Sequence, residues 1–171
     1  DYDEAVKMIG ESKAIYEALK DAESATKCDN QIGSLAINKG NFEVALNSFL
    51  KVVSANEKRP EAEQSVEPYL NLGWIYFNLN HLAKCQAYLQ EAVKLAEKLD
   101  NDASWMLVSE KQATLFMYIG ERYLKQAQTD SMQRKQFQDS SAIFINQSFE
   151  AYGRSLKLSK KLGDKANEVS V

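Results

Sequence analysis

The sequence predicts an all-α fold of antiparallel helix pairs stacked on one another, and two observations lead to this prediction. The first is a 40-residue repeat, in which Gly33 and Gly73 each follow a large aliphatic residue. The second is a small side chain, Ala45 or Cys85, that stands 12 residues after each glycine and precedes a large one. Antiparallel helices approach closely where one offers a small residue and the other fills the gap. Because one hairpin of this size cannot bury its apolar faces, we expect the pairs to stack.

Both units resemble the tetratricopeptide repeat, whose pattern is a large residue, Leu-Gly and Tyr, followed by Gly, Ala and Phe. The matching residues are Tyr69, Leu72, Gly73 and Tyr76 in one unit and Gly33, Gly40, Phe42, Ala45 and Phe49 in the other. The repeat period exceeds the common ~34 residues and is typical of the subclass with longer helices. The resemblance implies a superhelix with a concave groove lined by the first helix of each pair.

The N-terminal part is predicted to hold one helix at 1–20 and a first repeat at 22–56. Met8, Ile15 and Leu19 contribute to an apolar pattern with three- and four-residue steps, which favours a single amphipathic helix. This helix is either the second helix of an incomplete earlier repeat or a cap on the first apolar face. Within the first repeat, Gly40 suits the left-handed backbone that ends a helix.

A second repeat is predicted at 60–99. Asn80 stands 40 residues after Gly40, so we expect the same left-handed ending there. Pro60 suits a first helical turn. Pro68 conflicts with a helix that runs unbroken from Pro60, and a helix start near Ser65 removes the conflict by placing Pro68 in the first turn.

A third repeat is predicted at 103–163, with a polar insertion near 126–141. Ile119, Gly120 and Tyr123 repeat the first-helix signature. Aligning Leu162 with Leu99 predicts an insertion of 16 residues, which lengthens one or both helices and forms a loop at their tips. Residues 165–171 are interpreted as the start of a further helix, and we expect the protein to continue.

Composition and chemistry exclude several function classes. A net charge of −3 argues against a nucleic-acid footprint, and charged residues interrupt every apolar run before a membrane span is reached. The single histidine, His81, and the separate Cys28 and Cys85 cannot assemble a metal site. No nucleophile–histidine pair or phosphate-binding glycine loop is present. We therefore expect no enzyme activity, no cofactor, no metal and no small-molecule substrate.

Binding of a protein or an extended peptide is the predicted function. The positions that face the groove in this repeat geometry supply the candidate partner-binding residues, which are Asn30, Gln31, Ser34, Asn38, Asn71, Trp74, Asn78, Tyr118, Glu121 and Lys125. Side-chain amides both donate and accept hydrogen bonds, so the asparagines could hold a peptide backbone without reading its charge. Trp74 and Tyr118 could cover an apolar side chain. The alternative is that the amides only solvate an exposed face.

Two families with 40-residue repeats are similar to this chain. The runs 40–46, 72–76 and 119–123 resemble the N-terminal repeats of Tonsoku, a nuclear scaffold of replication-coupled DNA repair. That resemblance implies binding of histone tails and repair factors in the nucleus. The run 162–168 resembles a linker of the Pins/LGN scaffolds of spindle orientation, which implies a cytoplasmic alternative. A third alternative is a structural oligomeriser without a peptide site.

Overall fold

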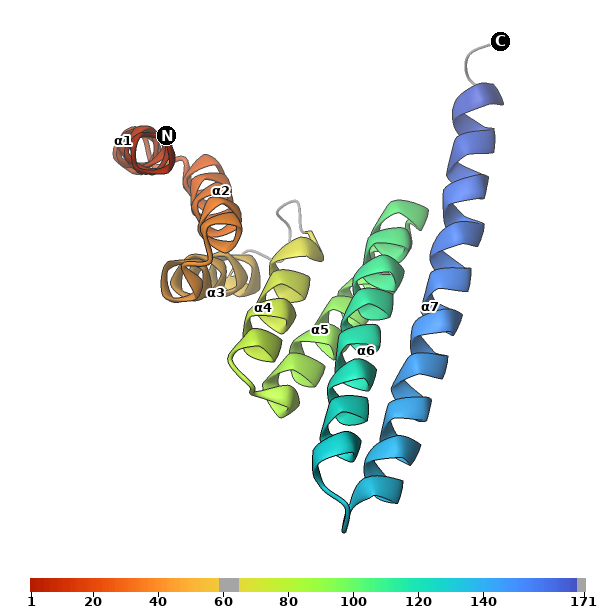
Figure 1. Cartoon of the computed structure of the whole chain (residues 1–171). Coiled ribbons are helices and arrows are strands. Elements are labelled where there is room, and N and C mark those ends of the chain that lie inside the picture. Colours follow the sequence, from red (N-terminus) through yellow and green to blue (C-terminus); the bar gives the residue numbers. More distant parts are fainter. Residues whose placement is uncertain (59–64, 169–171) are drawn as a thin grey trace. The chain divides into compact units, whose positions relative to one another are not determined.

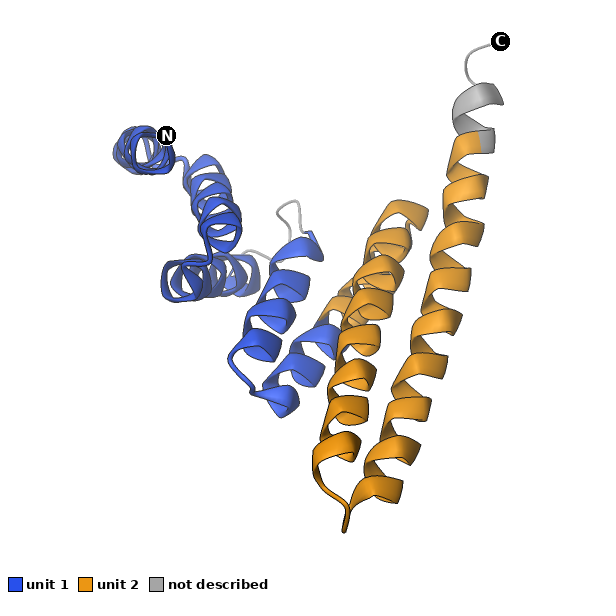
Figure 2. Ribbon diagram, in the orientation of Figure 1, with its two compact units in different colours: residues 1–91 blue, residues 92–171 orange. Residues whose placement is uncertain are grey.

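The computed structural model describes residues 1–58 and 65–168, and in this part of the chain all regular elements are α-helices (Figure 1). The helices are α1 (Tyr2–Ala18), α2 (Ala22–Lys39), α3 (Phe42–Lys58), α4 (Glu67–Asn78), α5 (Leu82–Leu99), α6 (Asp102–Thr129) and α7 (Arg134–Glu168). The all-α class is confirmed. The chain divides into two compact units, Asp1–Glu91 and Ala92–Val171, with the boundary inside α5 (Figure 2).

Unit 1 is held by a core that three successive helices share. Helix α2 packs against α1 and α3, and α3 also packs against α4. The buried cluster at the centre of these contacts consists of Ala36, Ala45, Phe49, Val53, Leu72 and Ile75. The second helix of the first repeat is therefore covered on its far side by the first helix of the next.

The predicted close approach at the glycines is confirmed in unit 1. A methyl group placed on Gly33 would lie 2.8 Å from the ring of Phe49, and one on Gly73 would lie 3.5 Å from the side chain of Leu89. In both pairs the large residue follows the glycine by 16 positions. The small residues Ala45 and Cys85 are fully buried. Small and large residues thus interlock with the same register in both repeats.

The predicted helix ends are also confirmed. Gly40 has φ of 78° and Asn80 has φ of 64°, both left-handed, and Lys20 after α1 has φ of 59°. At all three ends the next amide donates to the carbonyl five residues earlier, at 2.8–2.9 Å, as in a Schellman motif. Pro68 lies in the first turn of α4, as expected. Pro60, where the second repeat was expected to begin, lies outside the described residues.

Unit 2 contains a long antiparallel hairpin of α6 and α7. A methyl group on Gly120 would lie 2.7 Å from Cγ1 of Ile145 and 3.2 Å from the carbonyl oxygen of Ser141. The buried Ser148 hydroxyl donates to the carbonyl of Ala113 at 2.8 Å. Tyr123 stacks on the ring of Phe144 with centroids 5.7 Å apart. These contacts fix the register of the hairpin.

This register corrects the predicted insertion. The residue that fills the space at Gly120 is Ile145, which follows it by 25 positions rather than the 16 seen in the two repeats. The hairpin therefore contains nine extra residues, and the prediction of 16 was wrong. As expected, the insertion lengthens both helices, and the carboxylate of Asp130 caps the turn between them by accepting from the amides of Met132 and Gln133 at 2.9 and 3.0 Å.

The predicted start of a further helix at residue 165 is wrong for the residues that the structure describes. Helix α7 continues without a break through Gly163 to Glu168, and 169–171 lie outside the described residues. Gly163 has ordinary helical backbone, since its φ is not positive and a methyl group there would meet nothing within 4 Å. Without a left-handed φ it does not end the helix, unlike Gly40.

Candidate functional site

Seven of the ten predicted partner-binding residues lie in unit 1, on the first helices of the two repeats. Asn30, Gln31, Ser34 and Asn38 belong to α2, and Asn71, Trp74 and Asn78 belong to α4. Two pairs of equivalent positions have equivalent burial, since Ser34 and Trp74 are half-buried and Asn38 and Asn78 are exposed, whereas Gln31 is exposed and its equivalent Asn71 is half-buried. The 40-residue repeat therefore reproduces the burial of two of the three equivalent pairs of candidate residues.

The side chains of this face differ in their hydrogen bonds. The amide of Asn78 donates to the carbonyl of Trp74 at 2.8 Å, and the hydroxyl of Ser34 donates to the carbonyl of Asn30 at 3.0 Å. Both therefore bond within their own helix. The Oδ1 atom of Asn30 is buried and has no hydrogen-bond partner. Among the described residues no side-chain hydrogen bond is formed by Asn38 or Asn71, so their amides can engage a ligand.

An aromatic pair lies beside these amides on α4. The rings of Trp74 and Phe77 have centroids 5.9 Å apart and planes tilted by 32°. Both residues are half-buried. Each ring keeps an accessible part, which offers a flat apolar surface next to the polar positions.

The other three predicted residues lie in unit 2. Tyr118, Glu121 and Lys125 follow one another on α6 at three- and four-residue steps, so they share one face of that helix. All three are exposed. They form a separate surface with one aromatic, one acidic and one basic side chain.

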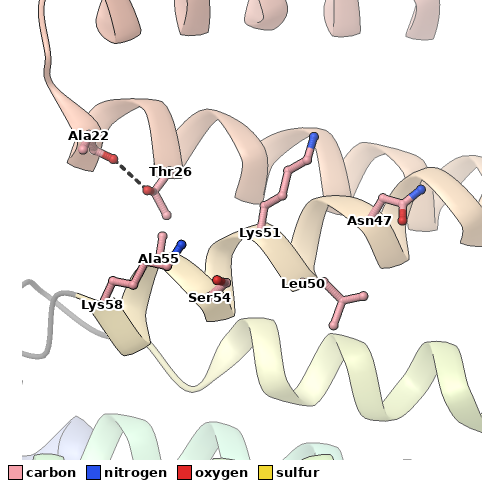
Figure 3. Close-up of a pocket in the computed structure, with 8 residues that line it drawn as sticks. All are labelled: Ala22, Thr26, Asn47, Leu50, Lys51, Ser54, Ala55 and Lys58. Carbon is pink, nitrogen blue, oxygen red and sulfur yellow. Dashed lines mark hydrogen bonds between the residues drawn. The ribbon is translucent and has the colours of Figure 1, made fainter.

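A shallow pocket in unit 1 was not anticipated from the sequence. It has a volume of about 830 Å³ and lies between the start of α2 and the outer side of α3 (Figure 3). Its lining residues are Ala22, Thr26, Asn47, Leu50, Lys51, Ser54, Ala55 and Lys58. The two lysines lie seven residues apart on one side of α3, and this spacing is the sequence signal that could have indicated the pocket. None of the predicted partner-binding residues lines it.

A smaller hollow of about 380 Å³ lies between α1 and α2 around an ion pair. The Lys13 ammonium lies 2.7 Å from a carboxylate oxygen of Asp29, and both side chains are largely buried. Burial alone would lower the pKa of Lys13, but the hydrogen bond and charge of Asp29 outweigh it, so the pKa is raised. The pair joins α1 to the first helix of the first repeat.

Among the described residues, no group of three or more His, Cys, Asp and Glu side chains is placed so that it could hold a metal ion. Burial raises the pKa of the Cys85 thiol to about 11 and also raises that of Cys28, which keeps both thiols protonated and unreactive at neutral pH. No helix in this part of the chain is long and apolar enough to cross a membrane.

Comparison with known proteins agrees with the repeat pattern. A family model described as tetratricopeptide repeat matches residues 30–59 and 66–99. No curated protein sequence matches the chain significantly. The two matched segments are tetratricopeptide repeats, and repeats of this kind generally mediate protein–protein interaction and scaffolding. The match includes residues 30–39 of α2 and the whole of α3, α4 and α5, so it contains all seven candidate residues of unit 1.

Proposed function

We propose that the chain is a non-catalytic interaction module that binds an extended peptide along the polar face of α2 and α4. The recurrence of amide side chains on this face carries the proposal: Gln31 and Asn71, and likewise Asn38 and Asn78, are separated by the 40-residue period of the fold. A solvated surface needs polarity only, whereas a site that follows a peptide needs the same groups at regular intervals.

The peptide is bound mainly through its backbone. Asn38 and Asn71 offer both donors and acceptors, which suit the alternating N–H and C=O groups of an extended chain. Trp74 and Phe77 provide the contact for one apolar side chain. The seven residues in unit 1 carry no charge, so this part of the site selects for small or apolar features. We propose Tyr118, Glu121 and Lys125 on α6 as partner-binding residues of unit 2.

The partner that we propose is a histone tail or a replication-repair factor, bound in the nucleus. The runs 40–46, 72–76 and 119–123, which resemble the Tonsoku repeats, support this assignment. A spindle-orientation scaffold in the cytoplasm and a structural oligomeriser are the competing functions. These three differ in the proteins that a purified bait should capture.

The test is a quantitative pull-down from nuclear extract with three baits: the wild-type chain, Asn71→Ala/Asn78→Ala, and the control Gln86→Ala/Gln90→Ala. The control removes two exposed amides from α5. We expect the Asn variant to lose binding several-fold or more while its melting temperature stays nearly unchanged, since Asn78 is exposed and Asn71 forms no side-chain hydrogen bond among the described residues. The control should bind as the wild type does.

Each result separates the functions. Core histones or repair proteins that disappear with the Asn variant alone would support the proposal. Cortical or spindle proteins would favour the Pins/LGN alternative. Equal capture by all three baits would mean that the amides are solvated surface, and recovery of the bait alone would favour the oligomeriser.

A further inference from the structure

Large apolar side chains are exposed along one side of the hairpin in unit 2. Phe149, Tyr152 and Leu156 are 63%, 42% and 59% exposed, and their spacing places them on one face of α7. The Tyr152 hydroxyl lies 3.5 Å from the hydroxyl of Thr114, so this face borders α6. Leu124 on α6 is exposed as well. Exposed patches of this kind mark interaction sites.

The first repeat of unit 1 shows what covers the positions that are equivalent to these exposed residues. When Gly33 is aligned with Gly120 and Phe49 with Ile145, Phe149 is the residue of unit 2 that is equivalent to Val53 of unit 1. In unit 1, Val53 is 7% exposed and shares a buried cluster with Leu72 and Ile75 of α4. The position that α4 covers in the first repeat is therefore open in the hairpin of α6 and α7.

The same holds on the first helix of each pair. In the alignment of the glycines, Leu124 on α6 is equivalent to Ile37 on α2. Ile37 packs against the cluster that α4 completes, whereas Leu124 is exposed. Both helices of the hairpin thus present the positions at which unit 1 receives a further helix.

We propose that Leu124, Phe149, Tyr152 and Leu156 form a docking face for an amphipathic helix of a partner protein. The helix docks as α4 docks on α2 and α3, with large apolar residues at three-residue spacing. This site is independent of the proposed peptide face on α2 and α4. Its aromatic residues supply the kind of side chain that dominates binding energy at interfaces.

The charge of α7 specifies an acidic partner helix. From 149 to 161 the helix carries one acid, Glu150, against four basic residues, Arg154, Lys157, Lys160 and Lys161. Lys161 pairs with Asp102 at 2.9 Å. Among the described side chains Lys157 and Lys160 form no ion pair, and Lys160 stands one turn beyond Leu156. Acidic residues beside the apolar stripe of the partner would pair with these two lysines.

Binding of a synthetic helix to the full chain tests the proposal. The probe has the sequence of 65–81 with Asn71→Glu, Trp74→Glu and Asn78→Glu, which keeps the apolar residues that α4 buries and makes the positions beside that apolar stripe acidic. A second peptide carries Lys at the same three positions. By fluorescence anisotropy we expect the acidic peptide to bind at least tenfold more tightly than the basic one.

Two variants of the chain locate the site. Phe149→Ser/Leu156→Ser should weaken binding of the acidic peptide at least tenfold, with unchanged circular dichroism because both side chains are exposed. The matched control is Met8→Ser/Ile15→Ser on α1, where the two side chains are 61% and 60% exposed. This control and Asn71→Ala/Asn78→Ala should bind the peptide as the wild type does.

Three results would overturn the proposal. These are no binding of the acidic peptide to the wild-type chain, equal binding by the Phe149→Ser/Leu156→Ser variant, and equal binding of both peptides. Light scattering adds a fourth. If the wild-type chain self-associates and this variant is monomeric, a second copy occupies the face instead of a partner helix.

Discussion

Units 1 and 2 use the same contact between a glycine and a large residue but differ in what surrounds it. In unit 1 the pair of α2 and α3 is covered by α4, and its core is shared among three helices. In unit 2 the helices α6 and α7 have 28 and 35 residues, and their outer side exposes Phe149. The neighbouring helix therefore buries this face in the first repeat, whereas the longer hairpin of unit 2 leaves the equivalent face exposed.

The three glycines also differ in the kind of atom that they face. Gly73 has ordinary van der Waals space, Gly33 faces a side-chain ring, and Gly120 faces backbone atoms of Ser141 and Ile145. A side chain can adjust its rotamer, but the backbone of a helix can give way only if the whole helix moves. Substitution by Ala should therefore rank the three sites.

Gly120→Ala should have the largest effect. Its methyl group would contact Cγ1 of Ile145 at 2.7 Å and the Ser141 carbonyl oxygen at 3.2 Å, which forces α6 and α7 apart. We expect a loss of about 2–3 kcal/mol in the free energy of unfolding, as for an overpacked core. The measurement is urea denaturation followed by circular dichroism. Gly153→Ala, where the methyl group meets nothing within 4 Å, is the control and should be neutral or stabilising.

Gly33→Ala should cost less, about 1–2 kcal/mol, because only the ring of Phe49 has to move. The matched variant Gly73→Ala should be neutral or slightly stabilising, since its methyl group fits at 3.5 Å and Ala favours helix by about 1 kcal/mol. Adding Phe49→Leu to Gly33→Ala should recover part of the loss if the ring causes it. Equal melting temperatures for the three Ala variants would contradict the ranking of the glycines.

The sequence predicted most of the fold because its signals were local. The left-handed ends at Gly40 and Asn80 and the first-turn Pro68 depend on single residues with restricted backbones. The insertion length was wrong because Leu162 and Leu99 were aligned by apolar character alone, which many positions on a helix share. The register is fixed by contacts between the two helices, such as that between Gly120 and Ile145.

The candidate site was less accessible to prediction. Spacing identified which positions of α2 and α4 recur, but the bond from Asn78 to the Trp74 carbonyl depends on a rotamer that no spacing encodes. The pocket with Lys51 and Lys58 depends on how α2 packs on α3. The role of the ten partner-binding residues stays a prediction until a ligand is bound.

Hydroxyl-radical footprinting of the isolated chain most directly tests the claim that unit 2 leaves open the face that α4 covers in unit 1. Oxidation rates would be measured for Val53, Phe149 and Leu156 and normalised to those of the urea-unfolded chain. We predict that Phe149 and Leu156 react at rates near those of the unfolded chain, whereas Val53 is strongly protected. Equal protection of Phe149 and Val53 would contradict the account, because the face on α7 would then already be covered.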